Sequence, residues 1–398
     1  MRFNLKETID KWFELGVTKG DILWFIDKEI RINSQDCVHF LISYIVIIFC
    51  CMEVVCQLVV LIIEGREIQH ILTYGPMFFI STQVLIIALP LIIQRNTYLD
   101  IYKKYWRIYN FEPAEHSTLQ EMRELFYTYV RLMILCCFVF TIAFFGFLPY
   151  NGLNYDDNIF PVIKALKLLE GFPKWLPIAI ILLNYILLMF KAYYLLVNVF
   201  HLMHMSGMYV VSNILLRGIL RSIAHTKRGL TELKLVEHEE YQHMVGLKLI
   251  NCVKLDMEIR RFANSQIDYY KWTMLLILPN SILLLSVFAY INMFMAGGDT
   301  PIGSVCVSID ANFMALTYGV CSELYLAQVG LNRLTLENTP WYTFSLSNRR
   351  TMLILLSNLQ KAKHISAGGL VHFNYEVLIS VMRKVFNVLT ILSSWAKE

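Results

Sequence analysis

Charged residues are scarce in this sequence. Asp, Glu, Lys and Arg make up 17% of its 398 residues, whereas ordinary soluble domains contain about 25%. The net charge is only +4, which excludes the strongly basic composition of nucleic-acid-binding proteins. The apolar set AVILMFWYC reaches 57%, and a water-soluble fold of this length cannot bury such an excess. The composition therefore indicates an integral membrane protein.

Motifs for catalysis and metal binding are missing as well. The nine cysteines form no CxxC pair, and most lie in apolar runs, where Cys packs as a small hydrophobe. GxxxxGKS/T, GxSxG and GxGxxG do not occur. His238 and His243 are five residues apart rather than four, so they diverge by about 140° on a helix and do not fit a zinc-protease motif. His201 and His204 have no third ligand nearby in the sequence. We therefore expect no enzymatic activity, no metal and no cofactor.

Seven apolar segments are long enough to cross a bilayer core of about 30 Å, which takes roughly 20 helical residues. The fourth is longer than a bilayer requires, and we expect it to project beyond the membrane. The start of the chain lacks the apolar core of a signal peptide. The sequence thus predicts an all-α integral membrane protein with seven transmembrane helices, at residues 40–63, 71–93, 125–149, 176–205, 272–296, 302–322 and 373–394.

The basic residues between these spans lie mostly on one side of the membrane. They gather in the N-terminal segment and in the second-to-third, fourth-to-fifth and sixth-to-seventh connections. The positive-inside rule then predicts a cytosolic N-terminus and an extracellular C-terminus, the reverse of a G-protein-coupled receptor.

The fourth-to-fifth connection, 211–271, has apolar residues near helical spacing with charges between them. We expect it to extend both helices into a cytosolic anchor bundle at a subunit contact; helices lying on the membrane surface are the alternative. The resulting division is a cytosolic segment 1–38, transmembrane helices one to four in 39–210, the anchor in 211–271, helices five and six in 272–322, a cytosolic loop and helix in 323–372, and the seventh helix with a short extracellular tail in 373–398.

Four ionisable residues lie deep in the predicted spans, where each costs about 2.5–3.5 kcal/mol at a helix centre. Glu53 and Lys191 either form a buried pair or line a wet cavity, and the sequence does not separate these alternatives. Arg383 and Lys384 are neighbours, so on a helix they point about 100° apart and cannot both face one partner. We expect a water-filled inner vestibule to solvate at least one of them.

The outer halves of several spans are rich in aromatic residues. Any single one is explained by lipid contact or helix packing, but together they can line an apolar pocket with a few polar groups, the usual construction of a small-molecule site. Such a pocket suits small, uncharged, volatile molecules. The candidate ligand-binding residues are Tyr74, Phe78, Phe79, Thr141, Phe145, Tyr185, Ile309 and Phe313.

The C-terminal quarter carries a recognisable pattern. It consists of Trp341, Gln360-Lys361, Ser366-Ala367-Gly368-Gly369, Glu376, Lys384 and Thr390-Ile391-Leu392 followed by Ser394. This order resembles the ending of the insect odorant receptor family. Asn387-Val388 and Ser393 depart from the family's commoner residues. The ending and the longer fourth-to-fifth loop of the family's co-receptor are absent, as is the TY…QF signature of gustatory receptors, so the chain resembles a ligand-tuning subunit.

The resemblance implies that four subunits surround a cation pore lined by the last span. It places a hydrophobic gate at Ile391, where a ring of branched side chains can close a pore by dewetting, and a polar pore position at Ser394. Gly368 and Gly369 would permit a break before the pore helix.

The function implied by the resemblance is an odorant-gated, non-selective cation channel. Its partners would be the odorant receptor co-receptor in a heterotetramer, a small volatile apolar or aromatic odorant and membrane lipids, without nucleic acid. Its place would be the plasma membrane of an olfactory neuron dendrite. A gustatory receptor channel of the same architecture is the nearest alternative; a G-protein-coupled receptor and a transporter are more distant ones.

Overall fold

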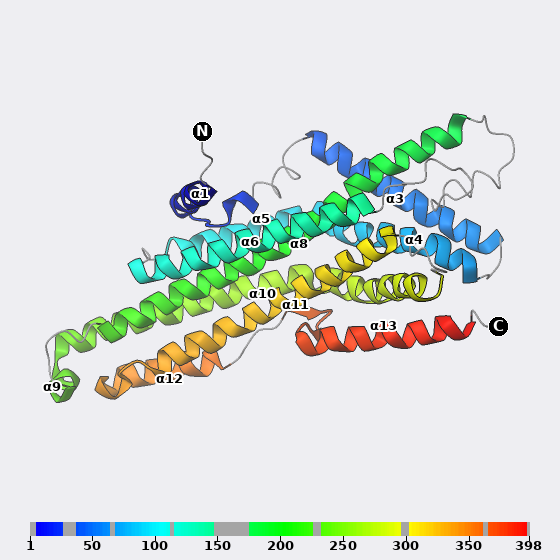
Figure 1. Ribbon diagram of the computed structural model, residues 1–398. Helices are drawn as coiled ribbons and strands as arrows, with labels where there is room; N and C mark the ends of the chain where they lie inside the picture. Colours follow the sequence, from blue (N-terminus) through cyan, green and yellow to red (C-terminus); the bar gives the residue numbers. More distant parts are fainter. Residues whose placement is uncertain are drawn as a thin grey trace.

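The computed structural model describes residues 5–26, 37–63, 68–111, 115–146, 175–225, 232–295, 302–360 and 365–395, and these are almost entirely helical (Figure 1). The predicted all-α class is confirmed. The elements are α1 (Leu5–Lys19), α3 (Cys37–Ile63), α4 (Ile68–Ile93), α5 (Arg95–Tyr109), α6 (His116–Gly146), α8 (Trp175–His225), α9 (Glu232–Glu237), α10 (Glu239–Tyr290) continued by a π-helical turn (Ile291–Met295), α11 (Ile302–Glu337), a 3₁₀ turn (Trp341–Thr343), α12 (Leu346–Leu359), β1 (Ser366–Ala367), β2 (Val371–His372) and α13 (Tyr375–Trp395).

The seven predicted spans fall on seven helices: α3, α4, α6, α8, α10, α11 and α13. The ends of the third and fifth spans, 147–149 and 296, lie outside the described residues. Within the described part of the chain, four stretches are long and apolar enough to cross a membrane: His116–Ile142, Ile186–Ala224, Glu239–Met293 and Tyr375–Ser394. Shorter apolar stretches, Ser43–Val59 and Gly75–Pro90, lie in α3 and α4.

Two helices are far longer than a bilayer. Helix α8 has 51 residues and α10 has 52, so each is roughly 75–80 Å long at about 1.5 Å per residue. Both pack against α11 as well as against each other, and the three run together to the end of the molecule where α9 and α12 lie (Figure 1). The expected projection of the fourth span and the expected helical form of 211–271 are therefore present, with a gap at 226–231 outside the described residues.

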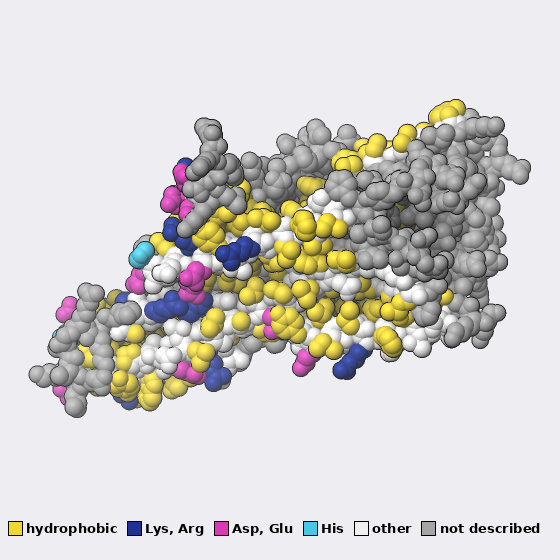
Figure 2. Space-filling view, in the orientation of Figure 1, with side chains coloured by type: hydrophobic (Ala, Val, Ile, Leu, Met, Phe, Trp, Pro, Cys, Tyr) yellow, Lys and Arg dark blue, Asp and Glu magenta, His cyan; other side chains and the backbone are white. Residues whose placement is uncertain are grey.

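The surface changes character along this long axis. In Figure 2, Lys, Arg, Asp and Glu side chains gather toward the end that carries α9 and α12, while hydrophobic side chains dominate the described middle of the face. Charged groups are expected in water and apolar groups in lipid. The gradient separates a polar projecting end from a membrane part on the same helices.

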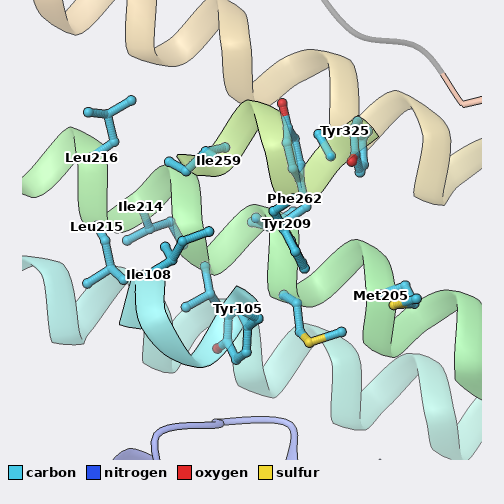
Figure 3. Close-up of a cluster of buried hydrophobic side chains, with 14 of the residues drawn as sticks. Tyr105, Ile108, Met205, Tyr209, Ile214, Leu215, Leu216, Ile259, Phe262 and Tyr325 are labelled. Atoms are coloured by element: carbon cyan, nitrogen blue, oxygen red, sulfur yellow. The ribbon is translucent and has the colours of Figure 1, made fainter. Parts of the chain in front are cut away.

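The projecting end has a closely packed core. All residues of α8 from 201 to 220 are buried, as expected for a helix surrounded by others on every side. Figure 3 shows Tyr105, Tyr209, Phe262 and Tyr325 meeting there from α5, α8, α10 and α11. The rings of Tyr209 and Tyr325 stack with their centroids 3.5 Å apart. This core joins the long helices into one unit.

Arg217 is buried inside that core, and each of its three guanidinium nitrogens donates a hydrogen bond. It donates to the Glu121 carboxylate from Nε at 3.1 Å, to Asn332 Oδ1 at 3.0 Å and to Gln328 Oε1 at 3.0 Å. Arg221, one turn further along α8, donates to the same carboxylate at 2.8 Å. A buried charge is tolerable only when it is paired and hydrogen-bonded, so this network allows α8 to be enclosed.

A small hairpin separates the projecting end from the last helix. Strands β1 and β2 pair antiparallel, and the turn between them places Gly368 at φ +62° and Gly369 at φ +76°, a region that favours glycine. The Gly368 N–H donates to the Lys271 carbonyl of α10 at 2.7 Å. A Cβ at Gly368 would lie 2.9 Å from Leu275 Cδ2. The glycine pair thus makes the break before α13 and ties it to α10.

Candidate functional site

The membrane part contains an apolar cavity with a volume of about 100 Å³ where six helices meet. Helices α4, α6 and α8 supply one part of its lining, and α10, α11 and the first turns of α13 supply the rest. A concave, mostly apolar site with a few polar groups is the usual build of a small-molecule pocket. Its lining from α11, from α13 and from the two residues before α13 comprises Ala311, Ala315, Tyr318, Gly319, Phe373, Asn374, Val377, Leu378 and Val381.

Small residues on one helix leave room for this cavity. Ala311, Ala315 and Gly319 follow one another at four-residue spacing, so they share a face of α11, and all three line the cavity. A Cβ at Gly319 would meet Leu378 and Tyr375 at 3.8 Å, an ordinary contact. The aromatic pattern of the sequence does not mark these positions; the four-residue spacing of small residues is the signal that does.

A buried ion pair stands at the cavity wall. Lys191 of α8 lines the cavity and pairs with Glu53 of α3, and both side chains are 1% exposed. Ser81 of α4 donates to the same carboxylate oxygen of Glu53, and its own oxygen accepts from Lys191 Nζ at 3.1 Å. Of the two alternatives left open by the sequence, the structure shows the buried pair, and Lys191 in addition borders the apolar cavity.

Two further polar groups of the lining already have partners. Gln83 Oε1 accepts from Asn280 Nδ2 at 3.2 Å, and the Tyr318 hydroxyl accepts from the Asn198 amide. The rest of the wall is dominated by aliphatic side chains from α8 and α10. The site has no described carboxylate in its lining, and Lys191 is its cationic group.

The predicted ligand-binding residues lie elsewhere or outside the description. The rings of Phe78 and Phe79 are 5.3 Å apart, Thr141 is exposed and donates to the Cys137 carbonyl at 2.6 Å, and Ile309 and Phe313 border an open depression on α11. These five do not line the cavity. The side chains of Tyr74, Phe145 and Tyr185 lie outside the described ones, so the outer aromatic pocket stays a prediction.

The two neighbouring histidines of α8 take part in packing at the start of the projecting end. His204 Nε2 lies 3.0 Å from Asp21 Oδ2, and its Nδ1 lies 3.3 Å from the Tyr98 hydroxyl. His201 bonds to the Tyr270 hydroxyl. His238 caps α10, since its Nδ1 accepts from the Tyr241 N–H at 3.2 Å. Each histidine therefore has a partner that the sequence spacing did not reveal.

A comparison with known families decides what kind of protein this is. Residues 107–386 match the family described as 7tm Odorant receptor. The chain belongs to the odorant receptor family. The resemblance seen in the C-terminal quarter is thereby confirmed over most of the chain, and the receptor is a multi-pass membrane protein.

Solved structures give the same fold. The insect olfactory receptor OR5 from Machilis hrabei in complex with eugenol is similar with a TM-score of 0.65 and 11% identity, over 94% of this chain and 97% of that one. The structure of OR5 described without eugenol has a TM-score of 0.64 and 10% identity, over 90% of each chain. No curated protein matches the receptor by sequence. At such low identity the likeness shows the fold alone.

The last helix of the receptor has one packed face and one open face. Val381 and Val385 pack with Leu285, and Leu389 and Leu392 pack with Val287 and Tyr290, all three from α10. Ile391 is 50% exposed on the other side. Ser394 is exposed and donates to the Ile391 carbonyl at 2.8 Å, and Arg383 and Lys384 are exposed as well. The four predicted pore and vestibule residues therefore have accessible side chains in the single chain.

Proposed function

We propose that the receptor is the ligand-tuning subunit of an odorant-gated, non-selective cation channel, assembled with the odorant receptor co-receptor in the plasma membrane of olfactory neuron dendrites. Family membership supports the sensory role. The observation that carries the proposal is the cavity between α8, α10, α11 and the first turns of α13. A ligand there touches the helix that would line the pore. No catalytic step is part of this function.

The proposed mechanism is differential binding. Val377, Leu378 and Val381 of α13 face the cavity, so a movement of α13 changes the shape of the ligand site. An odorant that fits the open arrangement better shifts the population toward it, and only by its difference in affinity between the two states. Each tenfold preference supplies about 1.4 kcal/mol toward opening.

The open face of α13 supplies the conduction path in this proposal. With a cytosolic N-terminus, Arg383 and Lys384 lie in the inner vestibule, and Ile391 and Ser394 lie further out. Their exposure in the single chain is compatible with facing a central pore. Four Ile391 side chains would close the pore by excluding water. Ile391→Ala should raise the current in the absence of odorant, measured with the co-receptor present.

The deciding experiment fills the cavity. Ala315→Phe adds a ring to its wall, while Leu316→Phe changes a side chain that is 48% exposed and does not line it. With the co-receptor present and equal surface expression, we expect Ala315→Phe to raise the odorant concentration for half-maximal current at least about tenfold, since it displaces ligand contacts worth more than about 1.4 kcal/mol. Leu316→Phe should leave it unchanged.

The outer aromatic pocket is tested in the same assay. If Ala315→Phe responds normally and Phe145→Ala and Phe79→Ala lose the response, the ligand binds at the predicted outer residues and not in the cavity.

Two further measurements test the alternative functions. A gustatory-type channel would conduct alone, so a ligand-evoked current recorded without the co-receptor would favour that alternative. A tag on the N-terminus that antibody reaches in intact cells would favour a G-protein-coupled receptor and contradict the orientation.

A further inference from the structure

The buried ammonium at the cavity wall has more donors than partners. A lysine ammonium carries three N–H donors. Within the described part of the chain, Lys191 Nζ has two hydrogen-bond acceptors, one carboxylate oxygen of Glu53 and the Ser81 hydroxyl. The Lys191 side chain is buried and lines the cavity, whereas Glu53 and Ser81, the two partners of its ammonium, do not. The third N–H, which neither partner accepts, is the donor that this proposal assigns to a ligand in the mostly aliphatic space.

We propose that Lys191 is the specificity-determining residue of this cavity and that the ligand class is neutral, mainly apolar molecules with one hydrogen-bond acceptor oxygen, such as ketones, aldehydes or esters. The oxygen accepts from Lys191 Nζ, and the hydrocarbon part fills the space along Ala311, Ala315 and Gly319. The inference rests on the proposed function, since it names the ligands of the same site.

The acceptor is neutral because the charge is already balanced. Glu53 neutralises Lys191, and Ser81 bonds to both, so the three side chains have no net charge to offer. A carboxylate ligand would bring an unpaired negative charge into an apolar site and compete with Glu53, at a large desolvation cost. A ketone oxygen avoids both penalties.

A pure hydrocarbon is disfavoured for the opposite reason. It fills the apolar space equally well but leaves the third N–H of Lys191 without an acceptor in a buried site. A hydrogen bond to a charged group contributes about 1.5–3 kcal/mol, which corresponds to a preference of about 10- to 140-fold. The group that gives this preference is the Lys191 ammonium, which Glu53 of α3 and Ser81 of α4 hold in place.

The first arm of the test uses the unmodified receptor. Currents are recorded from full-length chain with the co-receptor for matched sets of straight-chain 2-ketones, alkanes and carboxylates of equal length, with acetophenone and ethylbenzene as an aromatic pair. We expect the ketones to act at concentrations at least about tenfold lower than either the alkanes or the carboxylates. Alkanes or carboxylates as potent as ketones would overturn the inference.

The second arm removes the donor without leaving a charge behind. Glu53→Gln with Lys191→Met eliminates the pair and the N–H, whereas Glu53→Gln with Lys191→Gln eliminates the pair but keeps an N–H donor. We expect the ketone-over-alkane ratio to fall to about one in the Met variant and to persist in the Gln variant. Tyr318→Phe is the matched control, since it removes a different polar group from the wall, and its ratio should stay unchanged.

The outcomes separate the two proposals. If no volatile of any class evokes a current although the receptor reaches the surface, the proposed function fails and the inference fails with it; if other volatiles evoke currents and the ketones do not, only the inference fails. If currents appear and the ratio survives in the Met variant, or collapses in Tyr318→Phe instead, the proposed function stands and the role of Lys191 is wrong. Should the Met variant not reach the surface, the wild-type comparison of ketone, alkane and carboxylate still decides the ligand class.

Discussion

The two halves of α8 are one continuous helix, but they differ in how far their side chains are buried. From 201 to 220 every residue is buried among α5, α6, α10 and α11. In the first half, Leu182, Ile186 and Met189 are exposed on one side, while Lys191 and Ala192 line the cavity on another. One half is therefore enclosed by protein, and the other is shared among lipid, protein and an internal space.

In the proposed function, this difference separates the part of the receptor that anchors the subunit from the part that responds to the ligand. Every residue of the projecting half from 201 to 220 is buried, and in a close-packed protein interior small changes of volume are costly. The membrane half keeps an internal space whose walls include α13. An element that must move on ligand binding belongs where packing is looser. The contrast predicts that similar substitutions have different consequences in the two halves.

The largest effect should come from the buried arginine of the projecting half. Arg217→Ala leaves Asn332 Oδ1 and Gln328 Oε1 without this donor and leaves Glu121 with Arg221 alone; removing one partner of a fully buried ion pair costs about 3–5 kcal/mol, which is the upper bound here because Glu121 is partly exposed. We expect a loss of surface expression and a lower melting temperature of the purified protein. Arg221→Ala, which removes a partly exposed donor to the same carboxylate, should cost less than about 1 kcal/mol. Equal losses would contradict the packing contrast.

Two glycines allow the tightness of packing to be compared between the projecting end, at Gly218 of α8, and the cavity, at Gly319 of α11. A Cβ at Gly218 would lie 2.4 Å from Thr118 Oγ1, and Thr118 is buried and stiff at χ1. Gly218→Ala should therefore cost about 1–3 kcal/mol through overpacking. Gly319→Ala at the cavity meets only ordinary contacts, so its melting temperature should match wild type or exceed it slightly. The reverse order would show that the cavity is the tighter region.

The hairpin before α13 gives a finer comparison. Gly368→Ala and Gly369→Ala both place a side chain at positive φ, at a cost of about 1–3 kcal/mol each. Only Gly368 adds a close contact, to Leu275, since nothing lies within 4 Å of a Cβ at Gly369. We expect Gly368→Ala to lower the melting temperature more than Gly369→Ala does. In a background that carries Leu275→Ala, which removes the contacting side chain, the two glycine substitutions should lower the melting temperature equally. A larger effect at Gly369 would contradict this geometry.

The smallest effect is confined to alkaline pH. Burial, and after it the nearby Asp21 carboxylate, raises the pKa of Tyr109 from 10.0 to about 12. The folded state thus holds this proton more tightly, so the stability it contributes is complete below about pH 10 and is lost as the pH rises to about 12. Melting curves from pH 8 to 12 should decline less steeply for Tyr109→Phe than for wild type. Identical curves would exclude this contribution.

Much of the fold could be predicted from the sequence because lipid imposes a simple rule. A span such as 40–63 must be helical and apolar throughout, since backbone groups find no water in the bilayer, and α3 covers it. The long fourth span and the helical pattern of 211–271 also predicted α8 and α10 correctly. The glycine pair was expected to permit a break before α13, and the structure places both glycines at positive φ in the turn that precedes this helix.

The candidate cavity could not be predicted in the same way. Its lining comes from six helices. Its volume depends on positions where the side chain is small or absent, such as Ala315 and Gly319. The aromatic-rich outer halves suggested Phe78, with Thr141 as a polar group beside it, and the side chains of both contact other neighbours. The size and place of an internal space depend on how the helices pack against one another, and the sequence of a single segment does not contain this information.

The sequence alone determined which segments enter lipid, that they are helical, and which family pattern the last quarter carries, because these follow from local hydropathy and short motifs. Only the tertiary structure decided that Glu53, Ser81 and Lys191 meet, although they come from three different helices. Partners so distant along the chain are chosen by packing, which balances every contact of the folded protein at once.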